Sequence, residues 1–207
     1  AAQSILDELT RSCTIGDRDI PVSASVGITV YPDDGKDGQS LLRHADLAMY
    51  RAKQEGKSTY RFFTPAMSRR AHERMLLLSS LRRGLERGEF ALRYQPVVHR
   101  DGAPLSLEAL VRWEHPETGE VSPDRFIQTA EESGLILPLG AFVLRTACAF
   151  AQSLGGEVRM AVNLSARQFA ADDLPAMVAD ALETSGVDPA TVCLELTESA
   201  LMADLDR

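Results

Sequence analysis

Three apolar segments of the chain each contain an oxygen-bearing side chain of a type that buried strands usually lack. Glu108 lies in SLEALVRW, Asn163 in MAVNLS, and Glu195 in CLELTES, where Glu198 follows three residues later. Burying an unpaired carboxylate is costly, so such groups are normally paired, protonated or bound to a metal ion. Carboxylates and amide carbonyls are the hard oxygen ligands that Mg²⁺, Mn²⁺ and Ca²⁺ prefer. Together these residues predict an oxygen-ligated divalent cation site, although each alone could be a helix cap or a strand residue that faces water.

Such a site requires elements that bring the three segments together. Strands are predicted at 90–98, 105–113, 158–164 and 191–196. Helices are predicted at 123–132, 139–153 and 173–185. Strands that alternate with helices of this length form βαβ units with a parallel sheet, and such folds assemble their active sites at the C-terminal ends of the strands. The first two strands are joined by a short turn at Asp101–Gly102 and are expected to be antiparallel.

The part of the chain before residue 89 has a different pattern. A helix at 5–9, a strand at 22–31, a helix at 41–52 and a strand at 59–63 indicate a fragment of an α+β sheet. Apolar residues then recur every three or four positions among arginines, which predicts one amphipathic linker helix. That helix could be an inter-domain lever, a surface for an anionic partner, or a connection with a solvated basic face. The expected domains are 1–63, 64–88 and 89–207.

Composition and charge limit the class of protein. The 207 residues are 44% hydrophobic and 25% charged, as in ordinary globular proteins, and the net charge is −8. Residues 89–207 hold 8 Lys and Arg against 19 Asp and Glu. An acidic surface of this kind argues against a DNA partner and suits divalent metal, although a solvated acidic surface is the simpler interpretation.

No membrane segment is expected, because the most apolar stretch, Leu135–Leu144, is shorter than the roughly 20 residues of a membrane-spanning helix and contains Pro138 and Gly140. The chain has three cysteines, and their spacing fits neither a zinc site nor a disulfide framework. This cysteine usage predicts a cytoplasmic location.

The order of several motifs resembles that of a known tandem protein family. LRYQPVV, SLEALVRWEHPETGEVSPDRFIQTAEESGLI, MAVNLSARQF and CLELTES resemble the first half of an EAL domain, the cyclic di-GMP phosphodiesterase family. Upstream, VSASVGITVYPDDG and LLRHADLAMYRAKQEGKSTYRFF resemble the C-terminal half of a GGDEF domain, the diguanylate cyclase family. The resemblance implies a fragment of a ferredoxin- or cyclase-like sheet followed by an incomplete TIM-type (β/α) barrel with an antiparallel first strand.

The resemblance also implies roles for individual residues. The metal ligands would be Glu108, Asn163 and Glu195, and Glu198 would support the loop over the metals. Gln95 and Arg112 would line the groove for the dinucleotide. A pair of Mg²⁺ or Mn²⁺ ions would activate a water for attack on one phosphodiester of cyclic di-GMP, giving linear pGpG. Lys53 and Lys57 lie at positions near the nucleotide phosphates of active cyclases, and could equally be exposed lysines at a helix end.

The chain departs from the family pattern in both halves. It contains no GGDEF loop, no Asp-Asp-Phe-Gly segment and no lysine after Lys57. The 207 residues alone are therefore expected to be inactive, whereas the full-length parent is expected to be the phosphodiesterase. The exposed strand edge of half a barrel favours a homodimer or other self-association through the EAL part. The alternative function is a non-catalytic module that senses cyclic di-GMP with degenerate domains.

Overall fold

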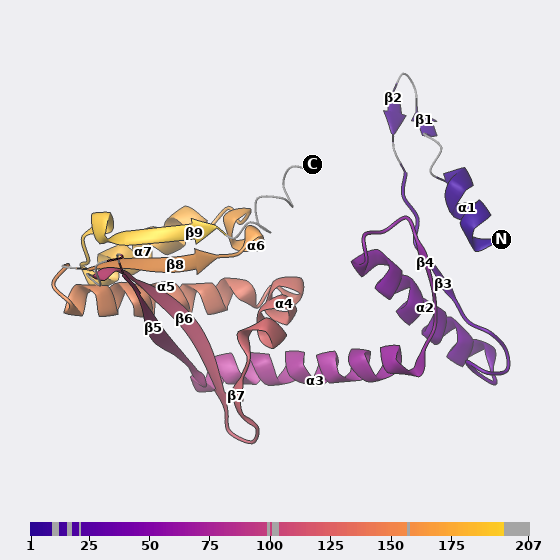
Figure 1. Ribbon diagram of the computed structural model, residues 1–207, viewed down its shortest axis with the longest axis horizontal. Coiled ribbons are helices and arrows are strands. Elements are labelled where there is room, and N and C mark those ends of the chain that lie inside the picture. The colour runs from indigo at the N-terminus through magenta and orange to yellow at the C-terminus, as the bar shows by residue number, and fades with distance from the viewer. Residues whose placement is uncertain are drawn as a thin grey trace. The chain divides into compact units, whose positions relative to one another are not determined.

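The computed structural model describes residues 1–9, 13–15, 18–20, 22–98, 100, 104–156 and 158–196. It divides into two compact units, Ala1–Met75 and Leu76–Arg207. Figure 1 labels the elements of both units. The long helix α3 (Pro65–Arg87) contributes residues to each of them.

The first unit is built around a parallel pair of short strands, β3 (Val26–Ile28) and β4 (Tyr60–Phe62). Helix α2 (Gly38–Gln54) packs on the pair and buries Ala48 and Ala52. Its N-terminus is capped by Asp37, whose carboxylate accepts a hydrogen bond from the backbone N–H of Ser40 at 2.8 Å.

The predicted strand at 22–31 is three residues long in the structure, so its expected length is wrong. Alternating apolar residues favour an extended chain, but a strand also needs a partner, and β4 offers only three residues. Beyond Ile28 the chain turns, with Asp34 N–H donating to the carbonyl of Val30 at 2.8 Å. The unit also contains helix α1 (Ala2–Leu9), which starts three residues before the helix predicted at 5–9. An antiparallel hairpin of β1 (Cys13–Ile15) and β2 (Arg18–Ile20) was not predicted from the sequence.

The second unit contains a five-stranded sheet. Its strands are β5 (Phe90–Val98), β6 (Pro104–His115), β7 (Gly119–Val121), β8 (Arg159–Leu164) and β9 (Val192–Leu196). The order is β5-β6-β8-β9, with β7 paired to the end of β6. Strand β5 is antiparallel to β6, whereas β6, β8 and β9 are mutually parallel. Both directions agree with those predicted from the turn and the helical connections.

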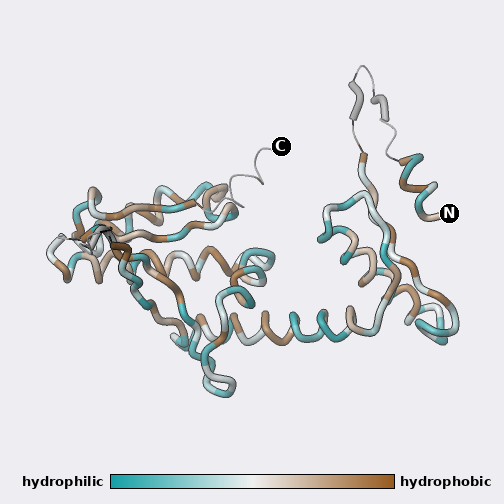
Figure 2. Tube along the Cα trace, viewed as in Figure 1, coloured by the Kyte–Doolittle hydropathy of each residue, from teal (hydrophilic) through white to brown (hydrophobic). Residues whose placement is uncertain are grey.

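Helices cover one face of this sheet (Figure 1). They are α4 (Pro123–Ser133), α5 (Ile136–Ser153), the short α6 (Ala166–Phe169) and α7 (Leu174–Ser185), followed by the 3₁₀ turn η1 (Pro189–Thr191). Helix α5 supplies the buried residues Val143, Leu144, Ala147, Cys148 and Ala151 to the core beneath β6 and β8. The apolar residues along α5 can be followed in Figure 2.

Helix α5 begins at Ile136, three residues earlier than the predicted start at Leu139. The helix can include Pro138 because proline is tolerated in the first turn, where the backbone N–H has no partner within the helix. By length and composition alone, α5 is the one helix in the described residues that could cross a membrane. Its apolar residues are instead those that pack under the sheet.

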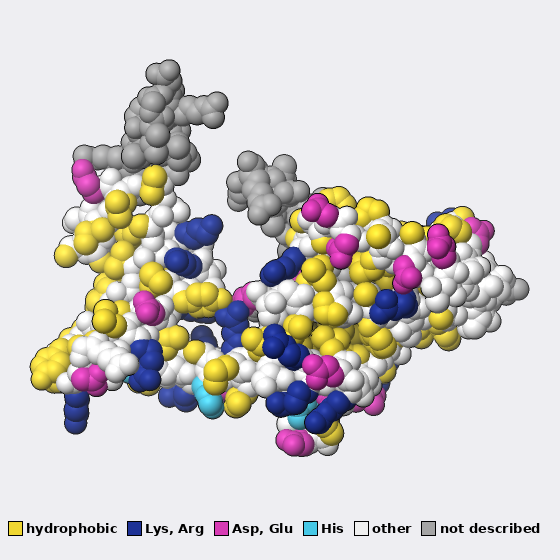
Figure 3. Space-filling view, turned by 180° about the vertical axis from the view of Figure 1, so that it is seen from behind, with side chains coloured by type: hydrophobic (Ala, Val, Ile, Leu, Met, Phe, Trp, Pro, Cys, Tyr) yellow, Lys and Arg dark blue, Asp and Glu magenta, His cyan; other side chains and the backbone are white. Residues whose placement is uncertain are grey.

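The excess of acidic residues in the second unit does not create a surface of one sign. In Figure 3, acidic side chains in magenta and basic side chains in dark blue share the visible face of this unit. The excess of acidic residues predicted for this part of the chain is therefore interspersed with arginines on that face.

Candidate functional site

The pleat of the sheet places the predicted site residues on the face opposite the helices. Side chains alternate along a strand, and residues paired across a parallel ladder point to the same side. Glu108 is paired with Gln95 on β5 and with Ala161 on β8, two residues before Asn163. Asn163 is in turn paired with Glu195 on β9. The register therefore gathers Gln95, Glu108, Asn163 and Glu195 on one face.

Glu108 and Asn163 are in direct contact. The Asn163 amide donates a hydrogen bond from Nδ2 to Oε1 of Glu108 at 2.7 Å. Glu108 is partly buried and Asn163 is exposed. The side-chain oxygen of Asn163 is not used in this bond, so the pair retains carboxylate and amide oxygens for a cation.

The chain just after Asn163 is held by a capping box at the start of α6. The Ser165 hydroxyl accepts from the backbone N–H of Gln168 at 3.3 Å, and the Gln168 side chain accepts from the backbone N–H of Ser165 at 3.1 Å. These reciprocal bonds fix the turn from β8 into α6. Both residues are buried, so the end of β8 that carries Asn163 is well anchored.

Glu195 is exposed on β9, beside Asn163 in the ladder. Its carboxylate therefore has access to the same face as the Glu108–Asn163 pair. Glu198, the residue predicted to support the loop over the metals, lies outside the described residues.

Arg112 lies further along β6, near its C-terminal end. Its side chain is 22% exposed, and Nη1 donates to the carbonyl oxygen of Val111 at 2.9 Å. Its Nε lies 3.4 Å from Oε1 of Glu120 on β7, and Glu120 also pairs with Arg93 at 3.2 Å. The guanidinium is therefore held at one place on the site face by a neighbouring carboxylate, with donors left for an anion.

A cavity of about 210 Å³ adjoins this end of the sheet. Arg112 and Asn163 line it together with residues of α4, α5 and α6, and most of its wall is apolar. Glu131 of α4 also lines the cavity, and burial raises the pKa of its carboxyl above the usual value. Gln168 lines it too and is 2% exposed, with an Nε2 that has no hydrogen-bond partner.

Glu131 and Gln168 are not among the site residues predicted from the sequence. The spacing Ser165-x-x-Gln168 after an apolar strand is a capping-box pattern and could have drawn attention to Gln168. Glu131 occurs in an ordinary helical segment, and its desolvation depends on tertiary packing that no local pattern reveals.

The donor set at the site fits a hard divalent cation. Glu108 and Glu195 offer carboxylate oxygens and Asn163 an amide oxygen, and Mg²⁺ is commonly held by only one or two carboxylates together with water and substrate oxygens. Within the described residues, no group of three His, Cys, Asp or Glu side chains is arranged to hold a metal ion. The candidate site therefore depends on the amide of Asn163 as well as the carboxylates.

Comparison with known proteins gives matches to two family models. The EAL domain model matches residues 78–207, and the model for the diguanylate cyclase GGDEF domain matches residues 1–59. The structure resembles "PaMucR Phosphodiesterase, c-di-GMP complex" with 43% sequence identity and a TM-score of 0.59, over 63% of this chain and 55% of that one.

Two curated relatives are similar along almost the whole chain. The bifunctional diguanylate cyclase/cyclic di-GMP phosphodiesterase MucR of Pseudomonas aeruginosa is 40% identical over 99% of this chain and 31% of its own length. The cyclic di-GMP phosphodiesterase PdeR of Escherichia coli is 40% identical over 97% of this chain and 31% of its own length. The chain thus spans less than a third of the length of these relatives. Because the EAL model matches well over half of the residues, with GGDEF-domain residues before it, the chain belongs to the EAL domain family.

Proposed function

We propose that the full-length parent protein hydrolyses cyclic di-GMP to linear pGpG in bacterial second-messenger signalling. The observation that carries this proposal is the Glu108–Asn163 contact, made on the same face as Glu195 by strands that the chain connects through helices. The names of the relatives and of the similar structure support cyclic di-GMP as the substrate. In this proposal the sheet is the first half of a (β/α) barrel whose remaining strands lie in the parent.

Glu108, Asn163 and Glu195 would hold a divalent cation, Mg²⁺ or Mn²⁺, in a two-metal site that this chain completes only in part. Such ions supply an activated water and neutralise charge on the leaving oxygen when bound. Glu198 is retained as the proposed support of the loop over them. The residues of this chain bind and orient; the remaining carboxylates and the base are expected from the parent.

Arg112 and Gln95 would orient the substrate on the site face. The Arg112 guanidinium suits a phosphate because its planar donors can form charge-assisted hydrogen bonds to two oxygens. Gln95 is paired with Glu108 and lies on the same face, so its amide can reach a group bound beside the metal ligands. The apolar cavity next to Arg112 can exclude water from the flat face of a base.

The chain of 207 residues is proposed to be inactive by itself and to self-associate. Its last described strand, β9, pairs with β8 on one side only, and among the described residues of this unit no helix packs on the site face. A parent segment or a second copy of the EAL part would cover them, since unpaired strand edges associate readily.

The test uses the full-length parent with cyclic di-GMP and Mg²⁺, and follows pGpG by chromatography. Hydrolysis is expected, and Glu108→Ala is expected to abolish it with little change in thermal stability. Glu114→Ala is the matched control, because Glu114 is an exposed carboxylate on the same strand and the same side of the sheet. Tight binding of cyclic di-GMP without any pGpG would reject the enzyme in favour of the sensor.

A further inference from the structure

The C-terminal turns of α3 belong to the core of the second unit. Leu81 is fully buried and packs with Phe90, Trp113 and Phe126 in one apolar cluster. Trp113 stacks on Phe90 with ring centroids 5.4 Å apart and meets Phe126 edge to face at 5.7 Å. The helix that enters from the first unit is therefore attached to β6, the strand that carries Glu108 and Arg112.

Glu89 ties the end of α3 to β6 through three hydrogen bonds. Its backbone N–H donates to the carbonyl of Gly84 in α3 at 3.0 Å, and its own carbonyl accepts from the N–H of Glu114 on β6 at 2.9 Å. Its carboxylate accepts from the indole Nε1 of Trp113 at 3.0 Å. Because Trp113 is fully buried, this last bond satisfies a donor that has no access to water.

Gly84 permits the close approach on which this arrangement depends. A Cβ atom at this position would lie 2.9 Å from the indole nitrogen of Trp113 and 3.0 Å from Oε2 of Glu89. Real Cβ contacts are almost never this short, so any side chain at position 84 must displace the Trp113–Glu89 pair. Helix α3, the turn at Glu89 and strand β6 are therefore in close contact at Gly84, with no space for a side chain at that position.

This junction lies immediately beside Arg112. Trp113 follows Arg112 on β6, and the two side chains point to opposite faces of the sheet because side chains alternate along a strand. The bond from the Glu114 N–H to the Glu89 carbonyl joins the end of α3 to the β6 backbone two residues after Arg112, so a shift of α3 is transmitted to the backbone that carries Arg112 on the site face. Glu108 lies four residues before Arg112 on β6, in the part of the strand that is paired with β5 on one side and β8 on the other.

We propose that Glu89, Gly84 and Trp113 form a positioning junction that sets the place of Arg112 relative to α3. A movement of α3 then changes the affinity for substrate, through Arg112, more than the turnover at Glu108 and Asn163. This inference rests on the proposed function in assigning Arg112 to the substrate. The contacts of the junction itself are independent of that function.

The first test compares two substitutions at Glu89 in the full-length parent. Glu89→Leu removes the acceptor of the indole N–H and is expected to raise KM for cyclic di-GMP about tenfold, with kcat within twofold of the wild type. Glu89→Gln keeps a side-chain oxygen acceptor, and its KM is expected to stay close to that of the wild type. Glu86→Ala, an exposed position in the last turn of α3, is the control and should change neither constant.

A second readout does not depend on catalysis. Trp113 is the single tryptophan of the 207 residues, so this chain gives one indole N–H resonance in nitrogen-15 NMR spectra. That resonance should move upfield in Glu89→Leu, where the hydrogen bond is lost, and remain in place in Glu89→Gln. If Glu89→Leu does not fold, Trp113→Phe removes the same donor and is expected to raise KM in the same way.

The outcomes separate the two proposals. Absence of pGpG from the wild-type parent would overturn the proposed function, and the junction would then be tested by the Kd for cyclic di-GMP, expected to rise about tenfold in Glu89→Leu. A fall in kcat at constant KM, or no change in KM and Kd despite the shifted indole resonance, would overturn the positioning role.

Discussion

The side-chain amide of Asn163 donates a 2.7 Å hydrogen bond to the carboxylate of Glu108, which joins two residues 55 positions apart in the chain. The bond suits a neutral donor next to an ionised acceptor. Replacing the neutral donor by a second carboxylate, as in Asn163→Asp, therefore tests whether a cation binds beside this pair.

Asn163→Asp would place a second carboxylate against Glu108. Without metal, like-charge repulsion is expected to lower the Tm of the 207-residue chain at pH 7 by about 2 to 4 °C, corresponding to roughly 1 kcal/mol in a chain of this size. Mg²⁺ should restore most of the loss, because the two carboxylates could then share the ion. Thermal denaturation in EDTA and in Mg²⁺ measures both effects. Asn163→Ala, which loses the hydrogen bond without adding charge, should show no such recovery, and equal responses of the two variants would contradict a cation site here.

Glu131 gives a prediction about pH. Burial raises the pKa of this carboxyl in the folded chain, so the ionised form disfavours the folded state above that raised pKa. The penalty disappears as the pH falls toward the usual value of 4.5. Glu131→Gln is therefore expected to raise the Tm by about 1 to 3 °C at pH 7 and to leave it unchanged at pH 4.

The control for this measurement is Glu183→Gln, since Glu183 is exposed on α7. It should leave the Tm nearly unchanged at both values of pH. A stabilisation by Glu131→Gln that is the same at pH 4 and pH 7 would show that desolvation of the charge is not the cause.

Gly140 and Gln168 should behave as a coupled pair. A Cβ atom at position 140 would lie 1.9 Å from Nε2 of Gln168, which is buried next to α5. Gly140→Ala is expected to destabilise the chain by about 1 to 3 kcal/mol, as overpacked cores do. In the double variant Gly140→Ala/Gln168→Ala the clash is absent, so urea denaturation should give less destabilisation than the sum of the single changes. Simple additivity would argue against this contact.

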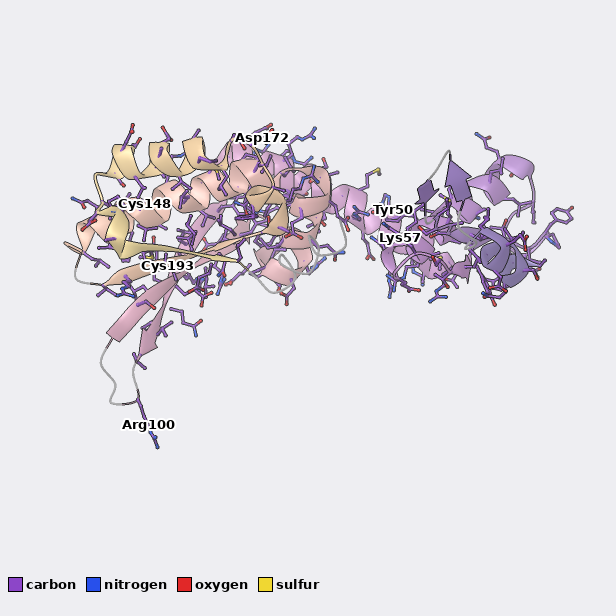
Figure 4. The ribbon with its side chains drawn as sticks, turned by 90° about the horizontal axis from the view of Figure 1, so that it is seen from above. Tyr50, Lys57, Arg100, Cys148, Asp172 and Cys193 are labelled. Carbon is purple, nitrogen blue, oxygen red and sulfur yellow. The ribbon has the colours of Figure 1, made fainter. Side chains whose placement is uncertain are left out.

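The reactivity of Cys148 and Cys193 toward a thiol reagent should show which side of the sheet is covered. Cys148 on α5 is fully buried, and burial raises the pKa of its thiol, whereas Cys193 on β9 is exposed on the site face (Figure 4). In the 207-residue chain with Cys13→Ser, diluted until it is monomeric, a thiol reagent at pH 8 should label Cys193 and spare Cys148 until the chain unfolds. In the full-length parent Cys193 should be protected as well. Equal labelling of Cys193 in both proteins would contradict the proposal that a parent segment covers this face.

The sheet was predictable where local pattern and topology agree. The short turn at Asp101–Gly102 predicts antiparallel β5 and β6, and helical connections predict parallel β6, β8 and β9, as the structure shows. Because these directions also fix which strand ends meet, the sequence predicted that Glu108, Asn163 and Glu195 come together, whereas their shared face follows from the register of the ladders. Their roles at a metal site stay predictions.

Features set by tertiary packing were not predictable. The length of β3 depends on how many residues β4 provides, and alternation of apolar residues cannot report that number. The start of α5 depends on whether Pro138 falls in the first turn or later, and a sequence pattern leaves both open. The desolvation of Glu131 and the unpartnered amide of Gln168 arise from helices that meet only in the fold.

The reversed direction of β5 decides where the chain enters the second unit. Phe90, at the beginning of β5, lies opposite Trp113 near the end of β6. A nine-residue strand is about 30 Å long. If β5 were parallel to β6, the preceding helix would therefore end at the opposite edge of the sheet, about 30 Å from the strand ends where Arg112 and Asn163 lie. Because β5 is antiparallel, the chain enters this unit at the same edge of the sheet that carries Arg112 and Asn163.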